Sequence, residues 1–144
     1  MRVLAIIVLL VLSGSAFSDM SFAPQTVTLG RLNPSITQRN IQSTICKPGW
    51  TAKQRPSLAW TYALKVRQLK ALGIPAGEAG RYWADHIVPI GLGGAPRSPR
   101  NIQPQLIADA KAKDVIEIKT YHEVCRGKKT LKEGQSVFLQ SQFK

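Results

Sequence analysis

The stretch "GRYWADHIVPIGLGGAPRSPRN", residues 80–101, decides how the fold of this chain is interpreted. Aromatic and β-branched residues dominate its apolar parts, which predicts two short strands and a glycine-rich loop. Pro89 would confine the second strand to a sheet edge or a bulge, because proline lacks the N–H that a central strand donates. Gly91, Gly93 and Gly94 permit a sharp return of the chain.

An aspartate and a histidine stand next to each other in this stretch, as Asp85 and His86, and the chain has only one other histidine, His122. Neighbouring side chains of a regular strand point to opposite faces, so both serve one site only if the strand ends or bulges here. Asn101 follows a proline-stiffened loop and precedes a predicted helix. Together these segments would form a compact cradle for one metal ion.

Helices are predicted on both sides of the hairpin, which makes the chain a small α+β domain. The segment 55–73 has apolar residues at helical spacing, namely Leu58, Tyr62, Val66, Leu69 and Leu72. The segment 103–125 places one stripe toward the expected core, formed by Ala108, Ala112, Val115, Ile118, His122 and Cys125. A last helix begins at residue 130, where Thr130 and Glu133 have the spacing of a capping box.

The chain of 144 residues is long enough for one domain with a modest core. Arg2, the apolar run 3–12 and the small residues before position 19 predict a signal peptide over residues 1–18 and a secreted or periplasmic protein. The alternative is an uncleaved membrane anchor, although about ten apolar residues are too few to span a bilayer. The polar residues 19–44 suggest a flexible lead-in before a domain at 45–144.

The formal net charge is +12, from 20 Lys and Arg against 8 Asp and Glu, and removal of Arg2 with the signal leaves 12 − 1 = +11. Such a charge suggests a polyanionic partner, which is nucleic acid, anionic lipid or acidic glycan, unless it serves solubility alone. Basic residues near the Asp-His pair could neutralise phosphates and would make affinity fall with salt; they are Arg81, Arg97, Arg100, Lys111 and Lys113.

The two cysteines, Cys46 and Cys125, are expected to form one disulfide, because an even pair in an exported chain is most simply bonded. The apolar stripe of the second helix would bring Cys125 to the core side, where Cys46 could meet it. The scattered cysteines and histidines lack the spacing of a zinc finger, so a structural zinc site is not expected.

The segment "DHIVPIGLGGAPRSPRNIQPQ", residues 85–105, resembles the core of the HNH (His-Me finger, ββα-metal) nuclease family. The shared pattern is Asp-His, a hydrophobic residue two before a proline, a Gly-Gly pair, and an asparagine followed by a hydrophobic residue. The segments "ICKPGWTAKQRPS" (45–57) and "YHEVCRG" (121–127) extend the resemblance to a group of small secreted bacterial HNH-like proteins. It covers residues 45 to 140 or so.

The resemblance implies a role for each motif residue. Asp85 would ligate a divalent metal ion, with Mg²⁺ favoured because its ligands are oxygens. His86 would be the general base that takes a proton from the attacking water. Asn101 would hold the loop and orient His86.

The family also has a second histidine, on the helix, as a metal ligand. By spacing from the motif asparagine, this position falls near Ala110 or Lys111, and neither is a histidine. The neighbouring Asp109 is the expected replacement, and Asp114 is a further candidate.

These inferences give three hypotheses of function. The first is an exported, metal-dependent endonuclease that cuts DNA, in preference to RNA, with little sequence specificity, because no sequence-reading helix is evident. The second is a basic nucleic-acid-binding protein that keeps the fold without catalysis. The third is an exported protein that associates with membranes or glycans.

Overall fold

The structure is a computed structural model that describes residues 30–140 of the chain. The signal peptide predicted for residues 1–18 therefore lies outside the described residues. Six elements position the site: α1 (Trp50–Gln54), α2 (Leu58–Ala71), β1 (Tyr82–His86), β2 (Ile102–Leu106), α3 (Ile107–Cys125) and α4 (Leu131–Gln140). Among the described residues, no helix is both long and apolar enough to cross a membrane.

The two strands form one antiparallel sheet, in which Tyr82 pairs with Leu106 and His86 pairs with Ile102. The chain is thus an α+β protein, as predicted. The position of the second strand differs from the prediction, because residues 103–106 belong to β2 and α3 begins only at Ile107. The segment around Pro89 is instead a turn before a short 3-10 helix at Ile90–Leu92.

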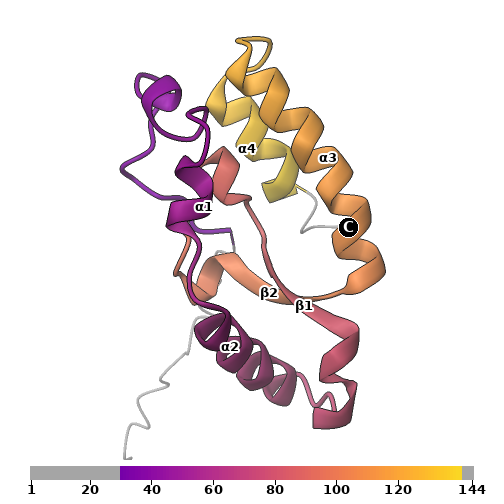
Figure 1. Ribbon diagram of the computed structural model, residues 1–144. Coiled ribbons are helices and arrows are strands. Elements are labelled where there is room, and N and C mark those ends of the chain that lie inside the picture. Colours follow the sequence, from indigo (N-terminus) through magenta and orange to yellow (C-terminus); the bar gives the residue numbers. More distant parts are fainter. Residues whose placement is uncertain (1–29, 141–144) are drawn as a thin grey trace, which may run out of the picture.

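Helices cover the hairpin from two sides (Figure 1). α2 contacts both strands on one side, while α3 follows β2 without a linker and contacts both strands on the other. α4 packs beside α3. The order strand, loop, strand, helix therefore brings the loop after β1 and the first turns of α3 to the same region of the molecule.

The loop between the strands turns back at Gly93 and Gly94, where any other residue would be strained. Gly93 has a φ of +81°, in the left-handed region. A Cβ on Gly94 would lie 1.8 Å from the carbonyl oxygen of Val88, so the backbone passes too closely for any side chain. The sharp return expected from these glycines is therefore present.

The core lies between the loop, α3, α4 and the segment before α1. It includes Ile45, Val88, Leu92, Val124 and Phe138. The segment 30–44 also contributes, through Ile36 and Ile41. The flexible lead-in expected over 19–44 is therefore wrong for residues 30–44, because their apolar side chains pack into the domain.

The buried faces of both long helices differ from those predicted. On α3, the stripe residues Val115 and Ile118 are 69% and 59% exposed, and His122 is also exposed. The buried residues of α3 are Ala110, Thr120 and Val124.

On α2, the buried residues are Leu64, Lys65 and Leu69, whereas Leu58 is 87% exposed. Tyr62 and Leu72, also expected in the core, are exposed. The spacing predicted both helices correctly. The predicted buried face was wrong for α3 and only partly right for α2.

Two local predictions are confirmed. Cys46 and Cys125 form a disulfide, with Cα atoms 5.6 Å apart. At the start of α4, the Glu133 carboxylate accepts from the backbone N–H of Thr130 at 2.7 Å, and the Thr130 hydroxyl accepts from the N–H of Glu133 at 3.2 Å. This is the reciprocal pair of a capping box.

Candidate functional site

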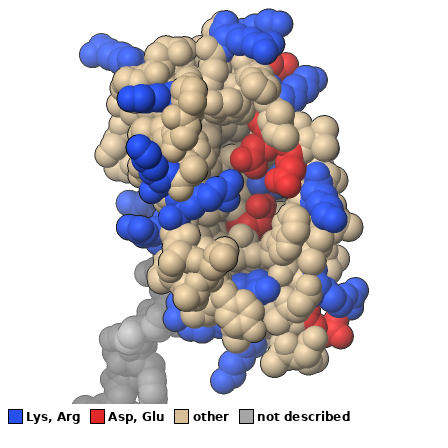
Figure 2. Space-filling view, in the orientation of Figure 1, with Lys and Arg blue, Asp and Glu red and all other residues tan. Residues whose placement is uncertain are grey.

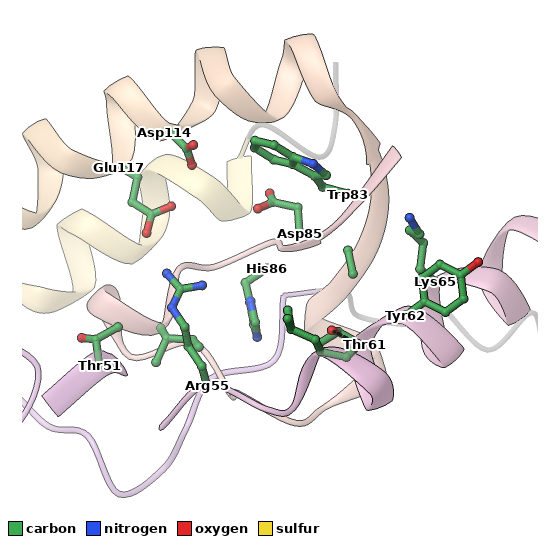
Figure 3. A pocket seen from close by; sticks show the side chains of 13 residues that line it. Thr51, Arg55, Thr61, Tyr62, Lys65, Trp83, Asp85, His86, Asp114 and Glu117 are labelled. Atoms are coloured by element: carbon green, nitrogen blue, oxygen red, sulfur yellow. Dashed lines mark hydrogen bonds between the residues drawn. The ribbon is translucent and has the colours of Figure 1, made fainter. Parts of the chain in front are cut away.

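A cavity of about 450 Å³ opens beside the end of β1. Its walls come from α1 and α2, from Trp83 to His86 of β1, and from α3 through Asp114 and Glu117. Asp85 and His86 both line it, but they leave β1 in different directions (Figure 3): Asp85 points toward α3 and His86 toward Arg55. The strand thus keeps its alternation of faces, and the cavity wraps around its end.

His86 is buried, and its ring is oriented by the loop. Its Nε2 lies 2.9 Å from the carbonyl oxygen of Pro96. A carbonyl oxygen only accepts hydrogen bonds, so Nε2 carries the proton in neutral imidazole and Nδ1 keeps its lone pair. Burial lowers the pKa of His86, although the Pro96 carbonyl and Asp85 act in the opposite direction. The neutral, proton-accepting form is therefore favoured.

Asn101 is fully buried and connects the two ends of the loop. Its Oδ1 accepts from the N–H of Val88 at 2.9 Å, and its Nδ2 donates to the carbonyls of Val88 and Ala95 at 3.0 and 3.1 Å. Val88 follows His86 by two residues and Ala95 precedes Pro96 directly. Asn101 thus fixes both the strand end that carries the imidazole and the loop that orients it.

Asp85 is paired with a helix side chain. The Nζ atom of Lys113 lies 2.8 Å from Oδ2 of Asp85, and the two side chains form an ion pair. The same Nζ donates a hydrogen bond to the carbonyl oxygen of His86 at 2.8 Å. It also lies 3.8 Å from Oε2 of Glu117, one turn further along α3.

The residues in this arrangement do not fit a divalent metal ion. Mg²⁺ requires several oxygen ligands around one point, and an ammonium group already occupies that side of Asp85. Within residues 30–140, no group of three His, Cys, Asp or Glu is placed to hold a metal ion. The proposed ligand Asp109 is exposed in the first turn of α3 and does not line the cavity.

Glu117 was not among the predicted site residues, and Asp114 was only a further candidate beside Asp109. Both Asp114 and Glu117 line the cavity. Burial raises the pKa of Glu117, against the opposing effect of Lys113. The available signal was the spacing of Lys113 and Glu117 at i and i+4, which places them on one face of a helix.

Figure 2 shows basic side chains around the hollow that contains acidic ones. The basic residues that line the cavity are not those predicted to bind nucleic acid. Arg55, at the end of α1, and Lys65, in α2, line the cavity. Lys65 is buried and donates to the carbonyls of Ala79 and Tyr82 at 2.9 and 2.8 Å, so its charge is held inside the wall. Arg55 is exposed, which makes it the lining cation most accessible to a ligand.

The five basic residues predicted to bind nucleic acid lie outside this lining. Arg81, Arg97, Arg100 and Lys111 are exposed, and Arg81 forms an ion pair with Glu78 at 2.6 Å. Lys113 is only 15% exposed in its side chain. The first four therefore lie on the surface, whereas Lys113 is part of the interior.

A comparison of the chain with models of protein families, with curated proteins and with solved structures finds no match. A fold by itself does not define an activity, so the geometry of the cavity is the basis for a function.

Proposed function

We propose that this protein is an exported endonuclease that binds the backbone of DNA at the cavity and hydrolyses its phosphodiester bonds with His86 as general base. The observation that carries the proposal is the state of His86. Its ring is buried, its pKa is lowered, and its Nε2 is committed to the Pro96 carbonyl, so Nδ1 is the nitrogen that can accept a proton.

The reaction requires few other groups. Nδ1 of His86 takes a proton from a water molecule, and the water oxygen attacks phosphorus. The bond between phosphorus and the leaving sugar oxygen breaks, and solvent returns a proton to that oxygen. The guanidinium of Arg55, at the cavity wall, would neutralise the negative charge that builds up on the phosphate oxygens.

The order of elements supports the resemblance to HNH nucleases. A histidine at the end of β1, an asparagine that fixes the loop, and a helix directly after β2 occur in the order which that family requires. The net charge of +12 supports a polyanionic substrate. No reaction step is assigned to a metal ion, because the carboxylates do not form a metal centre.

Cleavage of supercoiled plasmid tests the proposal, with the chain's two histidines as a matched pair. Replacement of a general base typically lowers the rate by about 10²–10⁴-fold, so His86→Ala should lose cleavage to this extent. His122→Ala should cleave like the wild type, because His122 is exposed on α3. Equal rates for the two variants would contradict the role of His86.

A second function is favoured by the ion pair between Asp85 and Lys113, because Asp85 is the residue that was expected to ligate the catalytic metal ion. In this alternative the protein binds nucleic acid without cutting it. Binding of DNA that weakens with salt, together with no cleavage at any divalent metal concentration, would support it. Failure to bind DNA at low salt would contradict both functions.

A further inference from the structure

We propose that the ammonium group of Lys113 is the resident cation of this site, held by Asp85 and Glu117, so that the cavity works without a divalent metal ion. The proposal deepens the proposed nuclease function and, for its catalytic consequence, rests on it. Its structural part concerns cation binding alone and can be tested without any activity.

The contacts of Lys113 are those of a bound cation. Its Nζ is surrounded by three oxygens from three residues: Oδ2 of Asp85 at 2.8 Å, the carbonyl of His86 at 2.8 Å and Oε2 of Glu117 at 3.8 Å. Two of these oxygens belong to carboxylates and one to the backbone of the catalytic strand. They are the hard oxygen donors that a divalent cation would otherwise use.

The fold explains why this lysine reaches the end of β1. α3 starts directly after β2 and packs against β1, so its inward face passes over the Asp-His pair. At the position where the family resemblance requires a ligand, Ala110 is buried and offers no donor atom. Lys113 stands one turn further along, and its long side chain extends to Asp85.

Lys113 is the one cation that forms ion pairs with both Asp85 and Glu117 among the described residues. The carboxylates of Asp85 and Glu117 are both largely shielded from water, with side chains 18% and 27% exposed. Buried carboxylates are costly unless they are paired. A metal ion entering beside Asp85 would have to displace the ammonium and then repel it at close range, which opposes metal binding.

Lys113 also packs as part of the interior, which argues against a mobile surface lysine. Its Nζ lies 5.4 Å from the centre of the Phe138 ring, in the core that α4 provides. Since Lys113 does not line the cavity, it neutralises and positions Asp85 and the strand end and is not expected to touch substrate. The cation exposed to the phosphate is then Arg55.

Titration with Mn²⁺, followed by the electron paramagnetic resonance signal of the free ion, tests the cation assignment. The wild type should bind no more Mn²⁺ than Asp85→Asn, because the ammonium already fills the place beside Asp85. Lys113→Ala should bind Mn²⁺ at least about tenfold more tightly than the wild type, since two carboxylates lose their cation. Lys111→Ala is the matched control, because it removes an exposed charge from the same helix.

Two outcomes would overturn the assignment. One is Mn²⁺ binding by the wild type that Asp85→Asn abolishes. The other is equal Mn²⁺ affinity of Lys113→Ala and wild type. Far-ultraviolet circular dichroism reports whether Lys113→Ala folds. If it folds poorly, Lys113→Met replaces it, because methionine keeps an aliphatic stem beside Phe138, and this variant should show the same tighter binding of Mn²⁺.

Plasmid cleavage in EDTA tests the catalytic consequence separately. The wild type should cut at the same rate in EDTA and in Mg²⁺, and loss of cutting in EDTA would overturn metal independence. If the protein cuts under neither condition, the proposed nuclease function fails, while the Mn²⁺ titration still decides whether Lys113 is the resident cation.

Discussion

Two regions of this molecule depart from the usual rule that polar side chains are exposed and apolar ones buried, and they do so in opposite ways. The region around the cavity encloses polar groups: His86 and Asn101 are buried, and Lys113 is mostly shielded from water. The outer face of α3 does the reverse and exposes Val115 and Ile118. Both regions belong to the same strand–loop–strand–helix unit, so the contrast does not separate two domains.

The contrast teaches that contact with the hairpin and with α4, and not side-chain hydrophobicity, determines which face of α3 is buried. Polar groups can face inward here because each finds a partner: Lys113 finds Asp85, and Asn101 finds backbone groups of the loop. Buried polar groups without such partners would destabilise the fold. On this protein the buried ionisable residues therefore mark the candidate site.

The largest expected effect lies at the end of α3, where Cys125 is bonded to Cys46. Their separation of 79 residues corresponds to a stabilisation of about 4 kcal/mol in the chain-entropy model. A Cys46→Ser, Cys125→Ser double variant should lose about this much unfolding free energy in urea titrations. Two alkylatable thiols in the native wild type would contradict the bond itself.

The second effect tests the buried polar group with the most partners. Asn101→Ala leaves the N–H and carbonyl of Val88 and the carbonyl of Ala95 without their partner, which should cost about 3 kcal/mol of unfolding free energy. Asn40 is the matched control, since it also bonds to local backbone but lies where water can replace it. If both alanine variants lose the same stability, burial of Asn101 is not what matters.

The third effect compares the two faces of α3 with one residue type. Val124 is fully buried, so Val124→Ala should lose about 2 kcal/mol of unfolding free energy. Val115→Ala should change it by less than about 0.5 kcal/mol, because its side chain is in solvent. A larger loss at Val115 in chemical denaturation would show that something covers the outer face in solution.

The smallest effect is a pH dependence of stability at His86. Burial lowers its pKa in the folded state, so the unfolded chain binds the proton at higher pH than the folded one. The stability from neutral His86 is fully present above the ordinary pKa of about 6.5 and is lost as pH falls from there through the lowered pKa.

Comparison of the unfolding free energy of the wild type with that of His86→Gln measures the contribution of His86 to the pH dependence. The charges near His86, on Asp85, Arg55 and Lys113, are present in both chains. The stability difference between them should be larger at pH 7.5 than at pH 5.5, about one unit on either side of the ordinary pKa. A difference that does not change with pH would show that His86 is not shifted.

The sequence predicted the local features of the fold well. Glycines at 93 and 94, the capping box of Thr130 and Glu133, and the cysteine pair each depend on short-range chemistry or on a count, and the structure has all three. The strand boundaries were less predictable. Residues 102–106 contain Pro104, which argues against a strand, and pairing with β1 makes them one.

The candidate site was predictable in its motif but not in its environment. Asp85 and His86 were expected together from the sequence, and both line the cavity, while Asn101 fixes the loop beside them. Glu117 and Arg55 were not expected, since nothing in their local sequence separates them from other surface charges. Asp109 was chosen by spacing, and the structure leaves it exposed and outside the cavity.

By itself, therefore, the sequence determined the α+β class, the basic character of the chain, the covalent link and the place of the Asp-His pair. Only the tertiary structure decided that Lys113 pairs with Asp85 and that Val115 and Ile118 of α3 face outward. Short-range rules act on neighbours in the chain, where spacing is fixed by the backbone. A charge finds its partner through space, and that distance depends on how α3 packs on β1.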